Sequence, residues 1–165
     1  MREPILVAPC DVGRGVFTSR LVHAGETLLT FRGRPYPRSH AIHSTPRGAY
    51  LLQVDSEKYI MPRAPARFVN HSCEPNSGLV DACVLVALVD LERGREVRFD
   101  YSTSMDEDLW TMPCACGQPS CRGVVRDFRF LPADLQRRYL EMGVVSPFIR
   151  AQYVLEKPEG DVAAA

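Results

Sequence analysis

The sequence has no long hydrophobic run and no excess of charge of either sign. Its 165 residues include 20 Lys and Arg against 20 Asp and Glu, so the formal net charge at pH 7 is zero. Binding to phosphates usually needs a basic excess, and we therefore expect no direct binding to nucleic acid. The longest apolar run is far too short to cross a bilayer, and the N-terminus has no signal-peptide layout. These absences predict an intracellular protein, cytoplasmic or nuclear, that is neither secreted nor bound to a membrane.

The composition is that of a folded chain with many turns. Hydrophobic residues make up 45% of the sequence, which allows a core and excludes wholesale disorder. Thirteen prolines and eleven glycines predict few long helices. The length suits one domain with a small appendage. Six cysteines without a secretion signal indicate metal binding, catalysis or burial rather than disulfides.

Short apolar stretches between turn signals predict a β-rich region over the first hundred residues. Residues 34–47, rich in proline, serine and histidine, predict a loop, and turns are expected at residues 55–57 and 90–95. The predicted strands are Ile5–Val7, Val16–Thr18, Glu26–Phe31, Ala49–Val54, Lys58–Met61, Leu79–Val80, Cys83–Val89 and Glu96–Tyr101.

The pattern changes after Tyr101. Residues 102–112 are polar and irregular, and a cysteine cluster follows. Helical spacing then joins Leu131 to Met142, with Pro132 in a first-turn position and Gly143 at the expected stop. A second short helix is expected from Ser146-Pro147, and residues 157–165 predict a disordered tail.

Three thiols fall within eight residues in the sequence Cys114-Ala-Cys116-Gly-Gln-Pro-Ser-Cys121. Zinc prefers four ligands in a tetrahedron and accepts thiolates readily. The spacing therefore predicts a zinc site whose fourth ligand comes from Cys10, Cys73, Cys83 or a histidine. Cys10 and Cys83 lie in or beside apolar segments, which favours burial as small hydrophobic residues. His40 and His43 have a metal-compatible spacing, but their loop favours two solvated side chains.

Four motifs in order resemble the SET-domain protein lysine methyltransferases. Residues 67–76 read R-F-V-N-H-S-C-E-P-N, which is similar to the central motif of that family. The G-R-G-V-F of residues 13–17 resembles its N-terminal glycine turn, and the E-V-R-F-D-Y of residues 96–101 resembles its late strand. The cysteine cluster, followed by Arg122-Gly123, resembles its post-SET motif. The resemblance spans about residues 4–125 and lacks the cysteine-rich pre-SET region of some members.

The resemblance implies a mainly β fold of several small, mostly antiparallel sheets. A C-terminal pseudoknot would bring Asn70 and His71 beside the Phe99–Tyr101 strand, and Cys73 would complete a zinc site with Cys114, Cys116 and Cys121. The implied organisation is a SET domain at residues 1–103, a zinc-bound post-SET motif at 104–125, and a helical extension with a tail at 126–165.

The resemblance also implies S-adenosylmethionine as methyl donor and lysine in a protein, possibly a histone, as acceptor. Tyr101 is the expected catalytic residue, because its hydroxyl could orient the amine beside the methyl group. The cofactor-binding residues implied by the motifs are Gly13, Arg14, Gly15, Arg67, Phe68, Asn70, His71 and Tyr101. Such an enzyme must align the reacting atoms, exclude water and supply a neutral amine.

Phe31, Tyr50 and Phe99 are the expected lining of the lysine channel. Phenylalanine at the Phe99 position usually accompanies multiple methylation in the family. The sequence departs from many relatives at Phe31-Arg32-Gly33, where they have a Tyr-x-Gly pattern, and at Val124, where some have tryptophan. At the first departure the amine loses one potential hydrogen-bond partner, which bears on the product state and the substrate geometry. Trp110 lies too far upstream to replace the missing tryptophan.

Two other functions remain open from the sequence. The chain could be a non-catalytic, zinc-stabilised interaction module, although it retains Asn70, His71 and Tyr101. Alternatively, the short loop at residues 34–47 leaves little room for a peptide-recognition insert and fits an enzyme that methylates a small amine metabolite.

Overall fold

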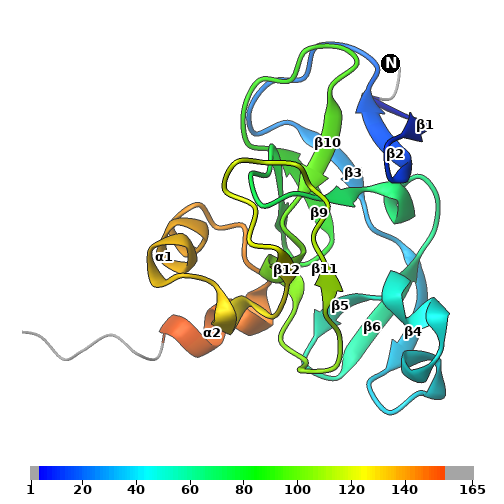
Figure 1. Cartoon of the computed structure of the whole chain (residues 1–165), viewed down its shortest axis with the longest axis vertical. Helices are drawn as coiled ribbons and strands as arrows, with labels where there is room; N and C mark the ends of the chain where they lie inside the picture. Colours follow the sequence, from blue (N-terminus) through cyan, green and yellow to red (C-terminus); the bar gives the residue numbers. More distant parts are fainter. Residues whose placement is uncertain (1–3, 155–165) are drawn as a thin grey trace, which may run out of the picture.

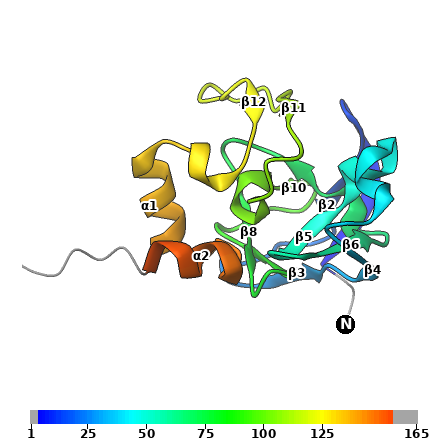
Figure 2. The ribbon, with the colours of Figure 1, turned by 90° about the horizontal axis from the view of Figure 1, so that it is seen from below.

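The structure is a computed structural model that describes residues 4–154. Four small sheets come first along the chain, and two helices follow them at one side of the molecule (Figure 1). Figure 2 shows these helices at the end opposite β4 and β6. The expected mainly β fold of small sheets is therefore confirmed. The expected tail at residues 157–165 lies outside the described residues.

The largest sheet brings together segments that are far apart in the sequence. Its strand order is β1-β2-β10-β7, with bounds Ile5–Cys10, Gly13–Thr18, Glu96–Phe99 and Asn70–His71. β10 pairs antiparallel with β2 and parallel with β7. Val16 and Val97 face each other across the first pairing, and both are fully buried. The predicted meeting of the Asn70-His71 segment with the late strand is confirmed.

A second sheet carries much of the main core. Its order is β3-β9-β8, with bounds Thr27–Thr30, Val84–Ala87 and Ser77–Val80. Leu79 and Leu85 are paired across β8 and β9, and neither side chain is exposed. They belong to one core cluster with Val16, Val97 and Phe99, so the second sheet packs against the largest sheet.

The third sheet corrects the loop expected at residues 34–47. Its order is β4-β6-β5, with bounds Gly33–Pro37, Lys58–Pro62 and Leu52–Asp55. Pro35 and Pro37 fit into β4 because it is an edge strand paired only with β6, where a missing N–H is tolerated. The predicted turn at residues 55–57 is confirmed between β5 and β6.

Short 3₁₀ helices occupy much of the remaining expected loop. Ala41–Ser44 (η1) and Pro46–Tyr50 (η2) lie between β4 and β5, and Ala66–Phe68 (η3) precedes β7. The strand predicted from Ala49 therefore begins only at Leu52, because Pro46 opens a helical turn before it. Likewise, the strand expected to reach Tyr101 ends at Phe99, and Tyr101–Ser104 forms η4 with the Asp100 side chain as its cap.

The chain ends in a hairpin and a helical extension. Met112–Pro113 (β11) and Val124–Val125 (β12) form the hairpin, and Phe128–Phe130 (η5), Ala133–Glu141 (α1) and Pro147–Val154 (α2) follow. Both predicted helices are confirmed, and Gly143 ends the first with φ +70°. Their apolar residues form a second core cluster around Phe128 and Ile149. No helix in residues 4–154 is long and apolar enough to cross a membrane.

The extension packs closely against the second sheet. A Cβ atom on Gly78 of β8 would lie 2.6 Å from the side chain of Val144, so only glycine allows this approach. The Ser146 N–H donates to the Thr103 carbonyl oxygen at 2.9 Å. The extension is therefore a fixed part of the fold, next to the segment that follows β10.

Candidate active site

The glycine turn and the Asn70 side chain meet at the edge of the largest sheet. Gly13 has φ +111°, and a Cβ atom on Gly15 would lie 2.6 Å from the Glu96 carboxylate. The Asn70 side-chain amide donates to the Arg14 carbonyl oxygen at 3.1 Å and to Glu96 Oε1 at 2.9 Å. These contacts hold the turn against β7 and leave a tight, polar backbone surface where a ligand can approach closely.

Arg14 and Arg67 flank the Phe68 ring. The Arg14 guanidinium lies 4.2 Å from the ring centroid, and that of Arg67 lies 5.7 Å away. Together with the Asn70 amide they offer cationic and hydrogen-bonding groups from β2, η3 and β7. Such a set suits a ligand that carries a carboxylate.

His71 is buried between the sheet and the cysteine cluster. Burial lowers the pKa of its imidazole to about 4, although the Asp100 carboxylate lies 3.6 Å away and acts in the opposite direction. Its Nδ1 accepts a hydrogen bond from the Tyr101 backbone N–H at 3.2 Å. A neutral imidazole that accepts at Nδ1 carries its proton on Nε2. That proton points to Cys73 Sγ, 3.4 Å away, so His71 links Tyr101 to the cluster.

Tyr101 is the centre of an aromatic group. Its hydroxyl donates to the Val69 carbonyl oxygen at 2.8 Å. Burial and the nearby Glu96 carboxylate raise its pKa, so the hydroxyl stays protonated at neutral pH. Ring centroids lie 4.9 Å apart for Phe99 and Tyr101 and 5.8 Å apart for Phe31 and Phe99. The hydroxyl is thus fixed in direction beside an apolar wall.

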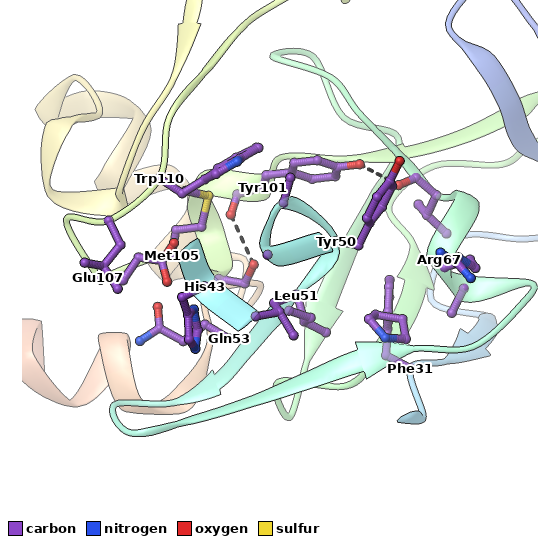
Figure 3. Close-up of a pocket in the computed structure, with 18 of the residues that line it drawn as sticks. Phe31, His43, Tyr50, Leu51, Gln53, Arg67, Tyr101, Met105, Glu107 and Trp110 are labelled. Carbon is purple, nitrogen blue, oxygen red and sulfur yellow. Dashed lines mark hydrogen bonds between the residues drawn. The ribbon is translucent and has the colours of Figure 1, made fainter. Parts of the chain in front are cut away.

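This aromatic group lines one side of a cavity (Figure 3). The predicted channel residues Phe31, Tyr50 and Phe99 all line it, together with Arg67 and Tyr101. The remaining predicted cofactor residues, Gly13, Arg14, Gly15, Phe68, Asn70 and His71, do not line it. Of these, His71 packs edge-on against the Tyr101 ring at 5.3 Å, and its neighbour Asn70 contacts the glycine turn. Tyr101 therefore stands between the two sets.

The opposite end of the cavity contains residues that the sequence did not predict for the channel. Figure 3 shows Glu107, Met105, Gln53 and His43 there, with Trp110 above them. The only sign in the sequence was a single tryptophan within the polar segment 102–112. Sequence patterns do not show that this irregular segment folds back over β5 and η1.

Tyr50 lines the cavity as predicted, whereas one of the two loop histidines lies differently from expectation. Tyr50 is 54% exposed at the end of η2, so it is not a core aromatic, and the Arg67 guanidinium lies 5.5 Å from its ring. His43 is half-buried, and its ring packs edge-on against Tyr59 at 4.5 Å. His40 caps η1 by accepting from the Ile42 N–H at 3.0 Å. His40 is exposed, as expected, but His43 is only partly exposed, because η1 folds it onto Tyr59 of the third sheet.

The four predicted zinc ligands form one cluster. The sulfur atoms of Cys73, Cys114, Cys116 and Cys121 all lie within 4.8 Å of one another, and Cys73 and Cys114 are 3.7 Å apart. A tetrahedral zinc–thiolate site would separate its sulfur atoms by about 3.8 Å. Backbone N–H groups of Arg122 and Gly123 point to the sulfurs of Cys73 and Cys121, at 3.4 and 3.5 Å. The donor set therefore fits a structural zinc ion.

The electrostatics of the cluster are uneven. Burial raises the pKa of the Cys73 and Cys114 thiols. Burial acts in the same direction on Cys116, but hydrogen bonds from the backbone of Cys73 and Gln118 outweigh it and lower the Cys116 pKa to about 7. Cys10 and Cys83 lie outside the cluster, and both are only partly buried.

A buried carboxylate connects the site to the C-terminal extension. Asp100 is 1% exposed and pairs with the Arg122 guanidinium at 2.8 Å. The Tyr139 hydroxyl of α1 donates to the same carboxylate at 3.0 Å. Asp100, which follows β10, therefore contacts the cysteine hairpin through Arg122 and α1 through Tyr139, and it lies 3.6 Å from His71.

The model of the SET domain matches residues 13–102 of this chain, which is more than half of it. The chain belongs to the SET domain family. The sheets, the parallel β7–β10 pairing and the Asn70–Tyr101 arrangement are therefore those of a SET domain. The match ends just before the cysteine hairpin and the helical extension, which lie beyond the shared core.

Curated relatives of this SET domain are much longer proteins. The chain is 30% identical over 126 residues to the histone-lysine N-methyltransferase trithorax of Drosophila virilis, covering 67% of this chain and 3% of the relative. It is 31% identical to the human histone-lysine N-methyltransferase 2B, with 67% and 5% covered. The rice histone-lysine N-methyltransferase TRX1 is 37% identical over 134 residues, with 70% and 13% covered. The chain thus spans only a small part of these relatives.

A solved structure shows the same fold. The crystal structure of KRYPTONITE in complex with mCHG DNA and SAH aligns with a TM-score of 0.59 and 23% sequence identity. The alignment covers 76% of this chain and 30% of that chain. At this identity the likeness shows the fold alone.

Proposed function

We propose that this SET domain transfers methyl groups from S-adenosylmethionine to the side-chain amine of lysine in proteins. The observation that carries the proposal is the position of Tyr101, between the Asn70–His71 group and the aromatic cavity. The three relatives above are named histone-lysine N-methyltransferases, and the aligned KRYPTONITE structure is a complex with SAH. Both lines of support point to the same reaction.

The cofactor would lie against the glycine turn and Asn70. When bound, it supplies an electrophilic methyl group on a sulfonium. Asn70 and the backbone of Gly13, Arg14 and Gly15 would hold its amino-acid part, and Arg67 and Phe68 would add cationic and apolar contacts. His71 keeps the Tyr101 backbone in place through the bond to its N–H. No metal is needed for this chemistry; the zinc proposed at the four cysteines would only stabilise the fold.

The aromatic end of the cavity would receive the lysine side chain. A free lysine amine has a pKa of about 10.4, so roughly one in 2,500 is neutral at pH 7. Burial among Phe31, Phe99 and Tyr101 disfavours the ammonium form and so helps to supply the nucleophile. Because the Tyr101 hydroxyl donates to the Val69 carbonyl, its oxygen lone pairs remain available to accept a hydrogen bond from the amine.

Phe99 and Phe31 favour multiple methylation. A hydroxyl at either position could hold a water molecule where a second or third methyl group must fit. Both side chains are apolar and nearly fully buried, at 3% and 5% exposure, so they offer no such site. We infer a dimethylated or trimethylated product.

The partners and location follow from the same proposal. The acceptor would be a protein lysine, possibly in a histone, and the enzyme would act inside the cell. The aligned structure contains DNA, but the expectation of no direct nucleic-acid binding by this chain rests on its zero net charge and stays a prediction.

The test is transfer of an isotope-labelled methyl group from S-adenosylmethionine. The zinc-loaded protein should label lysines in a proteome and in a peptide panel, with the sites read by mass spectrometry. Label that enters only small amines in a metabolite panel would favour the metabolite enzyme instead. No transfer to any acceptor, with S-adenosylhomocysteine failing to bind in calorimetry, would leave the interaction module.

A further inference from the structure

The cavity ends, opposite its aromatic wall, at a carboxyl group that the reaction does not require. Glu107 lines this end and is only 8% exposed. Its backbone is fixed on both sides, because its N–H donates to Asp127 Oδ2 at 3.1 Å and its carbonyl accepts from the Arg38 guanidinium at 2.7 Å. The backbone that carries this side chain is therefore held in place at the end of the cavity.

Glu107 has no cation paired with it in residues 4–154. None of the ion pairs in this part of the chain includes Glu107. Arg38 is engaged with its backbone carbonyl, and Arg129 pairs with three other carboxylates. A buried carboxylate without a paired cation is costly, which makes Glu107 a candidate for binding a cation from outside the chain.

The Tyr59 side chain lies beside the Glu107 carboxyl but outside the lining of the cavity. Burial raises the pKa of the Tyr59 hydroxyl, and the nearby Glu107 carboxyl raises it further. Tyr59 is 1% exposed, and its ring packs against His43 at 4.5 Å. Because a carboxylate has about four lone-pair sites, Glu107 can interact with this phenol and still accept hydrogen bonds from a ligand in the cavity.

The Glu107 carboxyl defines the ligand by its chemistry. A carboxylate attracts a cation, and a planar guanidinium can donate two parallel hydrogen bonds to its two oxygens. Leu109 and Trp110 line the same cavity, so apolar side chains can cover the aliphatic stem of such a residue. Since the aromatic wall and Glu107 belong to one cavity, a single substrate can occupy both ends.

We propose that Glu107, assisted by Tyr59, binds a basic side chain of the substrate close in sequence to the methylated lysine. This rests on the proposed function and adds a substrate class to it: peptides in which an arginine or second lysine accompanies the target. Glu107 is a specificity residue, because it contacts the substrate away from the reacting atoms.

The test is a cycle of matched changes in enzyme and peptide. The peptides carry one target lysine and either arginine or its neutral isostere citrulline at each position within three residues. For the wild type, arginine should be preferred in kcat/KM by about tenfold or more at one position, as for a buried charge pair. In Glu107→Gln this ratio should fall below about threefold, and in Tyr59→Phe it should decrease more modestly.

The outcomes separate the two claims. Glu141→Gln, on the exposed side of α1, is the matched control and should keep the wild-type ratio. A wild type that methylates arginine and citrulline peptides equally overturns the inference and leaves the proposed function standing. The same holds if the ratio persists in both Glu107→Gln and Tyr59→Phe. A wild type that methylates no peptide overturns the proposed function and, with it, the inference.

Discussion

The side chains that line the cavity have three different chemical roles. Phe31 and Phe99 form an apolar wall, Tyr101 presents a hydroxyl of fixed direction, and Glu107 places a carboxyl at the far end. The three roles need different chemistry, so each can be altered separately.

Replacing Phe99 with tyrosine tests the apolar wall. The added hydroxyl would hold water where further methyl groups must fit, so Phe99→Tyr should move the product toward monomethyllysine while activity remains. Phe31→Tyr, which restores the tyrosine common in the family, should act in the same direction. Mass spectrometry over a time course measures the product ratio. A wild type that stops at monomethylation would show that some other residue restricts the channel.

Replacing Glu107 with glutamine tests how much the buried, ionised carboxyl costs in stability. Burial raises the pKa of Glu107 above its ordinary 4.5, so the folded state holds this proton more tightly than the unfolded chain. Stability from this group is therefore present at low pH and lost as pH rises through the folded pKa. The charged or titratable groups facing it are Tyr59, Asp127, His43 and Arg38.

Glu107→Gln should consequently gain melting temperature relative to wild type as the pH is raised, by a few degrees near neutrality. Thermal unfolding across about pH 5 to 8 measures the difference. The exposed Glu141→Gln control should follow the wild-type profile. A difference in melting temperature that is the same at all pH values would mean that folding does not raise the pKa of Glu107.

At the scale of elements, the cysteine hairpin and α1 brace the site from outside the shared SET core. The hairpin reaches Cys73 through the sulfur cluster, and α1 reaches Asp100 through Tyr139. Both connections end within three residues of His71 or Tyr101 along the chain, so loss of either should disturb the positions of these two residues.

The hairpin should depend on its metal. We expect about one zinc per chain by elemental analysis of desalted protein, since four thiolates satisfy the ion completely. Cys116→Ser should release the zinc and abolish methyl transfer, because the hairpin would no longer be tied to Cys73. Cys83→Ser, outside the cluster, should retain it. Fully active, metal-free protein would refute the zinc site.

The extension should contribute measurable stability through one hydroxyl. Tyr139→Phe keeps the ring but leaves the buried Asp100 carboxylate with one donor fewer, at a cost of about 1–3 kcal/mol. Urea unfolding of zinc-loaded protein measures this change. Tyr50→Phe, at an exposed position, should stay within about 0.5 kcal/mol of wild type. Equal values for both variants would show that the Asp100 contact carries no weight.

Across the whole molecule, the sequence predicted regular elements and motifs better than irregular segments. Short apolar stretches between turn signals predicted strands such as β8, β9 and β10, and the family resemblance placed the Asn70-His71 segment beside β10. The edge strand β4 was missed because two of its five residues are prolines, which favour loops unless an edge accommodates them.

The cavity was predicted only in part, for a similar reason. Phe31, Tyr50, Phe99 and Tyr101 belong to motifs or strands, so resemblance placed them together. Glu107 and Trp110 lie on a segment without periodicity, whose path depends on contacts such as the Asp127 side chain accepting from the Glu107 and Asp108 N–H groups. Such contacts between distant loops leave no local pattern in a sequence.

The central claim is that Tyr101 orients a lysine amine for methyl transfer, and single-turnover kinetics of Tyr101→Phe test it most directly. This change keeps the ring packed on Phe99 and His71 and removes only the hydroxyl. With labelled S-adenosylmethionine and a lysine protein substrate, the chemical rate should fall by about 100-fold or more while the melting temperature stays close to wild type. A Tyr101→Phe protein that transfers methyl groups at a near-normal rate would contradict the account.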